Sequence, residues 1–152
     1  KSREQVVVDK LINEDTTEII NTNILQSDIL LFSLKKNSKK IKPLKIREGH
    51  IRKKEKVYVV GWGANDIGEA KIYEGRYVGS LGEKILIDMK GKANEIGLGG
   101  APVIDSKGYL IGVISTNHGK LSKPVSVFYL KELIKEWEAE KYPEQNKSRR
   151  LF

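Results

Sequence analysis

Short hydrophobic runs, rich in β-branched residues, recur along the chain and predict strands. The first lies at residues 5–12, with a possible second at 17–20, and the segment 28–34 (Asp-Ile-Leu-Leu-Phe-Ser-Leu) has the pattern of a buried strand. Further strands are predicted over residues 57–60, 69–79, 83–89, 102–104 and 109–115, with a turn at 79–82 pairing two of them. The pattern therefore favours a predominantly β protein.

The spacing of apolar residues changes near the end of the chain to that of an amphipathic helix. Ser126 is a suitable N-cap, and one helical face carries Val127, Leu130, Leu133, Ile134 and Trp137. Pro143 ends this pattern, and the residues after it have the composition of a frayed basic tail. A single C-terminal helix is therefore expected.

A glycine-rich loop, residues 97–103 (Gly-Leu-Gly-Gly-Ala-Pro-Val), precedes the last pair of predicted strands. Three glycines in four residues describe a sharply bent backbone whose amide groups face a cavity, an arrangement suited to an anion. Asp105 and Gly108 then occupy the first and last positions of a predicted hairpin turn. Loop, short strand, turn and long strand form one unit.

This unit resembles the nucleophile region of trypsin-like (chymotrypsin-fold) serine peptidases, whose pattern is Gly-x-Ser-Gly-x-Pro-Val or Leu. The match continues in the family's order at residues 28–31 (Asp-Ile-Leu-Leu), 61–63 (Gly-Trp-Gly) and 112–115 (Gly-Val-Ile-Ser). It covers roughly residues 28 to 137, and the lack of cysteine and the short loops resemble the HtrA group most. The chain departs from the pattern at Gly99, where the family has its nucleophilic serine.

The resemblance implies an all-β, chymotrypsin-like double β-barrel with a C-terminal helix, in which the second barrel is complete and the first only partial. We expect a first-barrel remnant and basic connector over residues 1–43, and the second barrel over 44–125. The helix would occupy residues 126–142 and the basic tail 143–152. Because residue 1 is a lysine, the chain is expected to be a processed or excised piece.

The resemblance also implies roles for individual residues. Asp28 corresponds to the triad acid, and the amides of Gly97 and Gly99 to the oxyanion hole. Ala93 corresponds to the floor of the specificity pocket, and a run of four residues corresponds to its wall: Ser115, Thr116, Asn117 and His118. Leu98 replaces the aspartate that receives the new N-terminus in activated trypsins, so that switch should not operate.

The catalytic base is missing, because the family order of His, Asp and Ser requires a histidine before Asp28 and none of the first 27 residues is one. His50 lies in the basic connector and is expected to be solvated. One interpretation is a disabled peptidase, in which an N-terminal segment or another chain supplies the histidine and the rest of the first barrel. The alternative is a natural pseudoprotease that serves as a peptide-binding or protein-binding scaffold, for instance by strand addition near Ser115 to Asn117. Both have a polypeptide as substrate or ligand.

The amino-acid composition excludes several kinds of functional site. The 152 residues contain no cysteine, which excludes disulfides, thiolate metal ligands and a cysteine nucleophile, and fits a bacterial or intracellular protein without fixing its location. The two histidines are not at ligand spacing, and no phosphate-binding lysine follows the glycine loop, so no metal or cofactor is expected. No apolar run approaches the ~20 residues of a membrane-spanning helix.

Positive charge is concentrated in one segment. Residues 35–56 hold eleven Lys or Arg and two acids, a net +9 against +8 for the whole chain, so all other residues sum to −1. A second alternative function is therefore binding of an anionic surface through Lys35 to Lys56. No aromatic residue interleaves with these cations, so nucleic acid is not expected as a partner and solvated surface is the simpler interpretation.

Overall fold

The computed structural model describes residues 5–13, 29–91, 97–115 and 121–141. Its contacts divide the chain into two compact units, Leu44–Tyr129 and a second that combines Lys1–Pro43 with Leu130–Phe152. Among the described residues, no helix has the length and apolar character needed to cross a bilayer.

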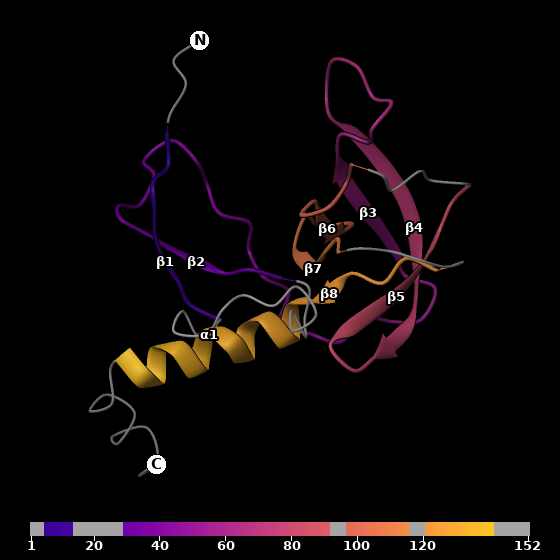
Figure 1. Cartoon of the computed structure of the whole chain (residues 1–152). Helices are drawn as coiled ribbons and strands as arrows, with labels where there is room; N and C mark the ends of the chain where they lie inside the picture. The colour runs from indigo at the N-terminus through magenta and orange to yellow at the C-terminus, as the bar shows by residue number, and fades with distance from the viewer. Residues whose placement is uncertain (1–4, 14–28, 92–96, 116–120, 142–152) are drawn as a thin grey trace, which may run out of the picture. The chain divides into compact units, whose positions relative to one another are not determined.

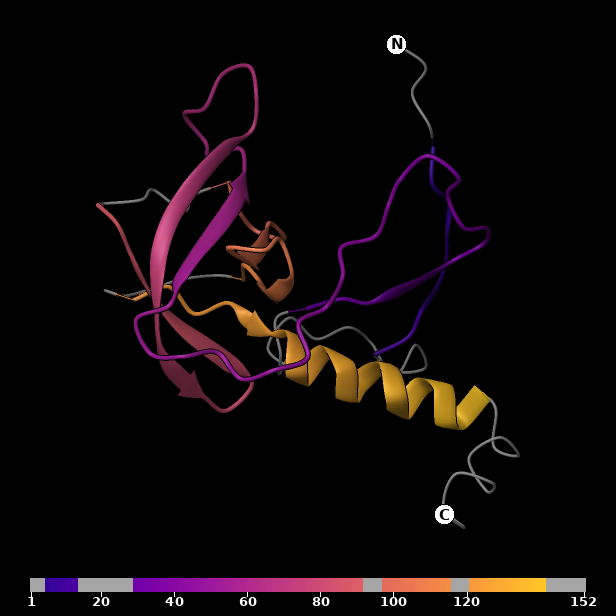
Figure 2. The same ribbon diagram turned by 180° about the vertical axis from the view of Figure 1, so that it is seen from behind.

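The larger unit contains a closed six-stranded antiparallel β-barrel (Figures 1 and 2). Its strands run around the barrel in the order β3-β4-β5-β8-β7-β6, so that β3 pairs with both β4 and β6 and closes the sheet. The strands are β3 (Lys56–Gly61), β4 (Lys71–Leu81), β5 (Lys84–Met89), β6 (Pro102–Asp105), β7 (Leu110–Val113) and β8 (Val125–Ser126).

Side chains at alternate positions of the strands point inward and fill the barrel interior. Val57 and Val59 of β3 and Ile87 of β5 are completely buried, and their neighbours along each strand face outward. The same core contains Ile85, Leu98, Val103, Ile111 and Ile114. Gly112 is required where β7 crosses close to β8, because a Cβ there would lie 2.9 Å from the carbonyl oxygen of Val125.

The smaller unit contains a two-stranded antiparallel sheet of β1 (Val8–Leu11) and β2 (Phe32–Leu34). The prediction of a buried strand at residues 28–34 is wrong for this chain, since Phe32 and Leu34 are 47% and 43% exposed. Two strands alone provide no second layer to cover a hydrophobic face. The possible strand at 17–20 lies outside the described residues.

The helix α1 (Val127–Lys141) begins where the sequence predicted. The hydroxyl of Ser126 accepts a hydrogen bond from the amide of Phe128 at 3.2 Å, which confirms its capping role. Val127 and Leu130 are buried, and the other three residues of the predicted apolar face are half-buried: Leu133, Ile134 and Trp137. The predicted mostly β class, with one complete barrel and a C-terminal helix, is confirmed.

The prediction of a turn at residues 79–82 is wrong. Strand β4 continues to Leu81, and the chain reverses at Gly82 and Glu83 instead. Gly82 provides the left-handed conformation, with φ of 57°, that a short hairpin turn needs. Gly79 lies in the strand beside an irregularity in the pairing of β4 with β5.

Candidate functional site

The glycine loop between β5 and β6 has a defined shape that depends on two glycines and one leucine. Gly97 and Gly100 adopt left-handed conformations, with φ of 88° and 82°, which other residues rarely take. Leu98 between them is only 1% exposed and packs in the barrel core. The amide of Gly100 donates to the carbonyl of Ile114 at 2.8 Å, which ties the loop to the residue that follows β7.

Position 99 differs from its neighbours because it has room for a side chain. A Cβ built on Gly99 meets no atom of the described residues within 4 Å, and its φ lies outside the left-handed region. At Gly97, in contrast, a Cβ would lie 2.8 Å from the amide nitrogen of Ala64. The loop therefore requires glycine at 97 and tolerates a side chain, including that of serine, at 99.

The exposed backbone of this loop presents hydrogen-bond donors. Gly97 and Gly99 are exposed, and among the residues that the structure describes neither amide donates a hydrogen bond. Backbone amides that are unpaired and close together in a bent loop can stabilise an oxyanion or bind another anion. The arrangement is compatible with the oxyanion hole expected at these two positions.

The hairpin between β3 and β4 lies against the glycine loop, as the contact of Gly97 with Ala64 shows. Asp66 organises this hairpin. Its carboxylate accepts hydrogen bonds from the amide of Gly63 at 2.7 Å and from the Tyr73 hydroxyl, and pairs with the Lys71 ammonium at 2.5 Å. The ammonium first, then the hydroxyl and the amide, lower the pKa of Asp66 to about 2, so the carboxylate stays charged above that pH.

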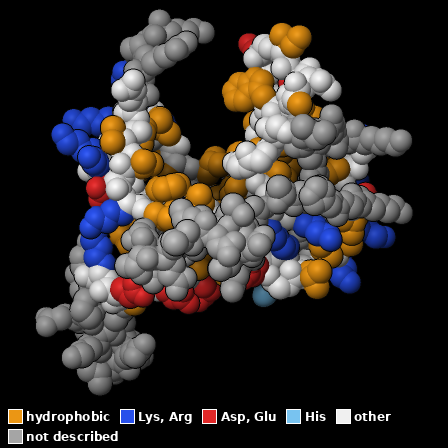
Figure 3. All heavy atoms as spheres, viewed as in Figure 1, with side chains coloured by type: hydrophobic (Ala, Val, Ile, Leu, Met, Phe, Trp, Pro, Cys, Tyr) orange, Lys and Arg blue, Asp and Glu red, His pale blue; other side chains and the backbone are white. Residues whose placement is uncertain are grey.

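Hydrophobic side chains gather around the tip of this hairpin (Figure 3). Trp62, Ile67 and Ile72 are 56%, 93% and 69% exposed, respectively. The indole nitrogen of Trp62 donates to the carbonyl of Gly68 at 2.9 Å, so the ring presents apolar surface to solvent. Exposed apolar surface beside a candidate site is typical of ligand contact.

Ser115, expected in the wall of a specificity pocket, is 8% exposed and uses its hydroxyl within the protein. The Lys84 ammonium donates to this hydroxyl at 2.5 Å, and the hydroxyl donates to the carbonyl of Lys123 at 3.3 Å. No local sequence signal identifies Lys84 as a partner of Ser115, because residue 84 is brought to residue 115 by the pairing of β8 with both β5 and β7.

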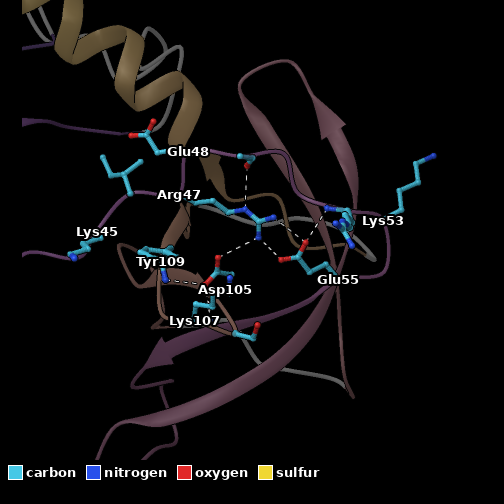
Figure 4. Close-up of a pocket in the computed structure, with 12 residues that line it drawn as sticks. Lys45, Arg47, Glu48, Lys53, Glu55, Asp105, Lys107 and Tyr109 are labelled. Atoms are coloured by element: carbon cyan, nitrogen blue, oxygen red, sulfur yellow. Dashed lines mark hydrogen bonds and ion pairs between the residues drawn. The ribbon is translucent and has the colours of Figure 1, made fainter.

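The basic segment is only partly a solvated surface. Arg47 is half-buried and lies between Glu55 and Asp105, as Figure 4 shows, with its Nη1 atom 3.3 Å from the Asp105 carboxylate and still closer to that of Glu55. Its guanidinium also donates to the carbonyls of Gly49 at 3.2 Å and His50 at 2.5 Å. The hydrogen bonds between Arg47 and Glu55 lower the pKa of the carboxyl and raise that of the guanidinium.

This ion network forms one side of a cavity of about 900 Å³ in the larger unit. The cavity lies between the segment 45–55 and the turn that joins β6 to β7. That turn has the predicted form, since the amide of Gly108 donates to the carbonyl of Asp105 at 3.0 Å and Gly108 has φ of 83°. No local sequence pattern predicts this cavity, because residues 45–55 and 105–109 meet only through tertiary packing.

Several predicted site residues lie outside the described residues: Asp28, Ala93, Thr116, Asn117 and His118. The structure therefore brings together Gly97 and Gly99 but does not test the triad acid or most of the expected specificity pocket. His50 is exposed. Across the described parts of the chain, no group of three or more His, Asp or Glu side chains is arranged to hold a metal ion.

Comparison with solved structures identifies the fold. The barrel and C-terminal helix have the architecture of the chymotrypsin-fold, trypsin-like serine proteases. An inactive form of the Rv3671c protease aligns over 70% of this chain at 13% identity and a TM-score of 0.52. A serine-to-alanine mutant of Rv3671c from M. tuberculosis H37Rv, also inactive, aligns over 89% at 12% identity and a TM-score of 0.55.

A third similar structure is kallikrein-related peptidase 10 in complex with Zn²⁺, which aligns over 70% of this chain at 11% identity and a TM-score of 0.55. The alignments cover 60%, 65% and 62% of the two Rv3671c chains and the kallikrein-related chain, respectively. No family model and no curated protein sequence matches the chain. At these identities the likeness defines the fold.

Proposed function

We propose that this chain is a trypsin-like serine peptidase domain in a catalytically disabled form, with Gly99 at the position of the nucleophile. The observation that carries the proposal is the shape of the glycine loop. Leu98 anchors the loop in the core, Gly97 and Gly99 are exposed, and position 99 has open space among the described residues and a φ outside the left-handed region. A serine placed there extends from the loop without strain.

In the proposed mechanism, the active form uses four groups: a nucleophile, a base, an acid that orients the base, and amide donors for the oxyanion. A serine at position 99 attacks the peptide carbonyl, an upstream histidine accepts its proton, and Asp28 orients that histidine. The amides of residues 97 and 99 stabilise the oxyanion. The histidine and the rest of the first barrel come from an N-terminal segment or another chain. Ala93 and the run from Ser115 to His118 are proposed to contact the substrate.

The test is fluorophosphonate labelling of the full-length protein carrying Gly99→Ser, read by intact mass. Addition of one phosphonyl group, with loss of fluoride, is expected at residue 99, and the Gly99→Ala protein is the matched control because it adds a Cβ without a nucleophile. Labelling of the serine variant alone supports a disabled peptidase.

Absence of labelling in a folded Gly99→Ser protein would contradict the proposed triad. The same result would favour the alternative, a pseudoprotease that binds polypeptides without cleaving them. That alternative predicts peptide binding of equal strength with glycine, alanine or serine at position 99, and the hydrophobic side chains at the tip of the β3–β4 hairpin would be its nearest contact surface.

A further inference from the structure

The cavity beside Arg47 has a floor whose acidic groups are already neutralised. One carboxylate oxygen of Asp105 accepts hydrogen bonds from the amides of Lys107 at 2.8 Å and Tyr109 at 3.0 Å, and the other oxygen faces Arg47. The Glu55 carboxylate accepts hydrogen bonds from the Arg47 guanidinium and from the amide of Arg52 at 3.0 Å. These two carboxylates are therefore occupied by Arg47 and by backbone donors.

The rim of the cavity carries an excess of positive charge. Its exposed cations are Lys45, Arg52, Lys53 and Lys107, and Glu48 adds one negative charge. Together with Arg47, Glu55 and Asp105, the lining has five cations and three acids, a net +2. Within the described parts of the chain, the three rim lysines make no ion pair. Figure 4 shows them on different sides of Arg47.

We infer that this cavity, the basic pocket, binds an acidic segment of a polypeptide. Like charges held around a hollow repel one another, and an anion that enters the hollow relieves the repulsion. A volume of about 900 Å³ is within the range of ligand pockets and accepts several side chains. The inference does not depend on the proposed peptidase lineage, since the pocket involves neither Gly97 nor Gly99.

The apolar lining and the concave shape of the pocket favour a polypeptide segment over nucleic acid. Three of the four rim cations are lysines, which act as point charges and attract carboxylates and phosphates alike. Ile46 and the partly exposed ring of Tyr109 also line the pocket and can contact the apolar atoms of a peptide. A concave site receives side chains, whereas a duplex presents a broad surface that a hollow of this size does not match.

The test is fluorescence anisotropy with the whole chain and a fluorescein-labelled hexaglutamate peptide. We expect saturable binding at about 50 mM salt that weakens clearly at about 200 mM, because added ions screen exposed charges. Replacing Lys45, Lys53 and Lys107 together by glutamate should raise the Kd at least about tenfold, since like charges then face each other across the site.

The matched control replaces Lys35, Lys36 and Lys39 by glutamate, which changes the net charge equally but leaves the pocket lining intact. This control should change the Kd less than about threefold, because salt screens surface charges that lie far from the pocket. If both triple variants weaken binding equally, or neither does, the pocket is not the site. Circular dichroism tests whether each variant folds. If a triple glutamate variant does not fold, the same three lysines are replaced by glutamine instead.

The identity of the ligand is tested with a labelled single-stranded oligonucleotide of the same charge as the peptide. Weaker binding of the oligonucleotide than of hexaglutamate supports the inference. Tighter binding of the oligonucleotide, lost in the pocket variant but kept in the control variant, would overturn the assignment to an acidic polypeptide.

Discussion

At the scale of single residues, two glycines in one loop have opposite requirements. Gly97 combines a left-handed φ of 88° with a Cβ position 2.8 Å from the backbone of Ala64, and neither problem can be relieved by moving a flexible side chain. Gly99 has neither constraint. The sequence alone treats the two positions alike, because both belong to one run of glycines.

Alanine at these two positions should therefore have different effects on stability. Gly97→Ala is expected to lower the free energy of unfolding by about 1–3 kcal/mol, the usual cost of a strained backbone conformation. Gly99→Ala should change it by less than about 0.5 kcal/mol, as at an unconstrained surface position. Urea denaturation of both variants measures the difference, and equal losses would mean that the loop moves to accept a side chain at 97.

The charge on Asp66 gives a second residue-scale prediction. Its pKa is about 2 in the folded protein and ~3.9 in an unfolded chain, so its stabilising effect is complete above about pH 4 and is lost as the pH falls toward 2. Amide exchange at Gly63, which donates to this carboxylate, should show decreasing protection over that range. Asp66→Asn should reduce protection already at neutral pH, and unchanged protection in that variant would contradict the role assigned to the charge.

At the scale of elements, sequence periodicity predicted the strands of the barrel and the helix well. The runs at 57–60 and 83–89 are buried on alternate positions, and a pattern of this kind is local enough to recognise. The turn between β4 and β5 was misplaced because Gly79 and Gly82 look equivalent in sequence, although only Gly82 has a positive φ. The exposed faces of Phe32 and Leu34 also could not be predicted, since apolar residues predict burial only when another layer exists to cover them.

The candidate site was predictable only where it is contiguous in sequence. The loop at 97–100 carries its own signal in the glycines, and the turn between β6 and β7 carries another in Asp105 and Gly108. The ion network around Arg47 depends on residues 8 and 58 positions away, so no local pattern identifies it. The turn-forming stretch Asn65 to Gly68 was the one available signal for the role of Asp66.

At the scale of the whole molecule, stability depends on the barrel core more than on exposed apolar groups. Ile87 is fully buried, whereas Ile72 on the paired strand β4 is 69% exposed. Ile87→Ala should lower the free energy of unfolding by about 2–5 kcal/mol, because it removes buried methyl groups and leaves a cavity. The same substitution at Ile72 should cost less than about 0.5 kcal/mol. Urea denaturation followed by far-ultraviolet circular dichroism compares them, and similar losses would contradict the assignment of the core.

Closure of the barrel has a consequence for how the protein is synthesised. Strand β3 pairs with β6, with Val59 opposite Val103. Strands β5 and β7 each pair with β8, which is the last strand of the barrel to be synthesised. Until Ser126 has left the ribosome, the strands already made keep unpaired edges. Translation from Lys56 to Ser126 takes roughly 4–14 s at the usual rates of synthesis. During that interval the nascent chain carries open hydrophobic edges, so chaperones that shield such edges have their greatest effect before β8 emerges.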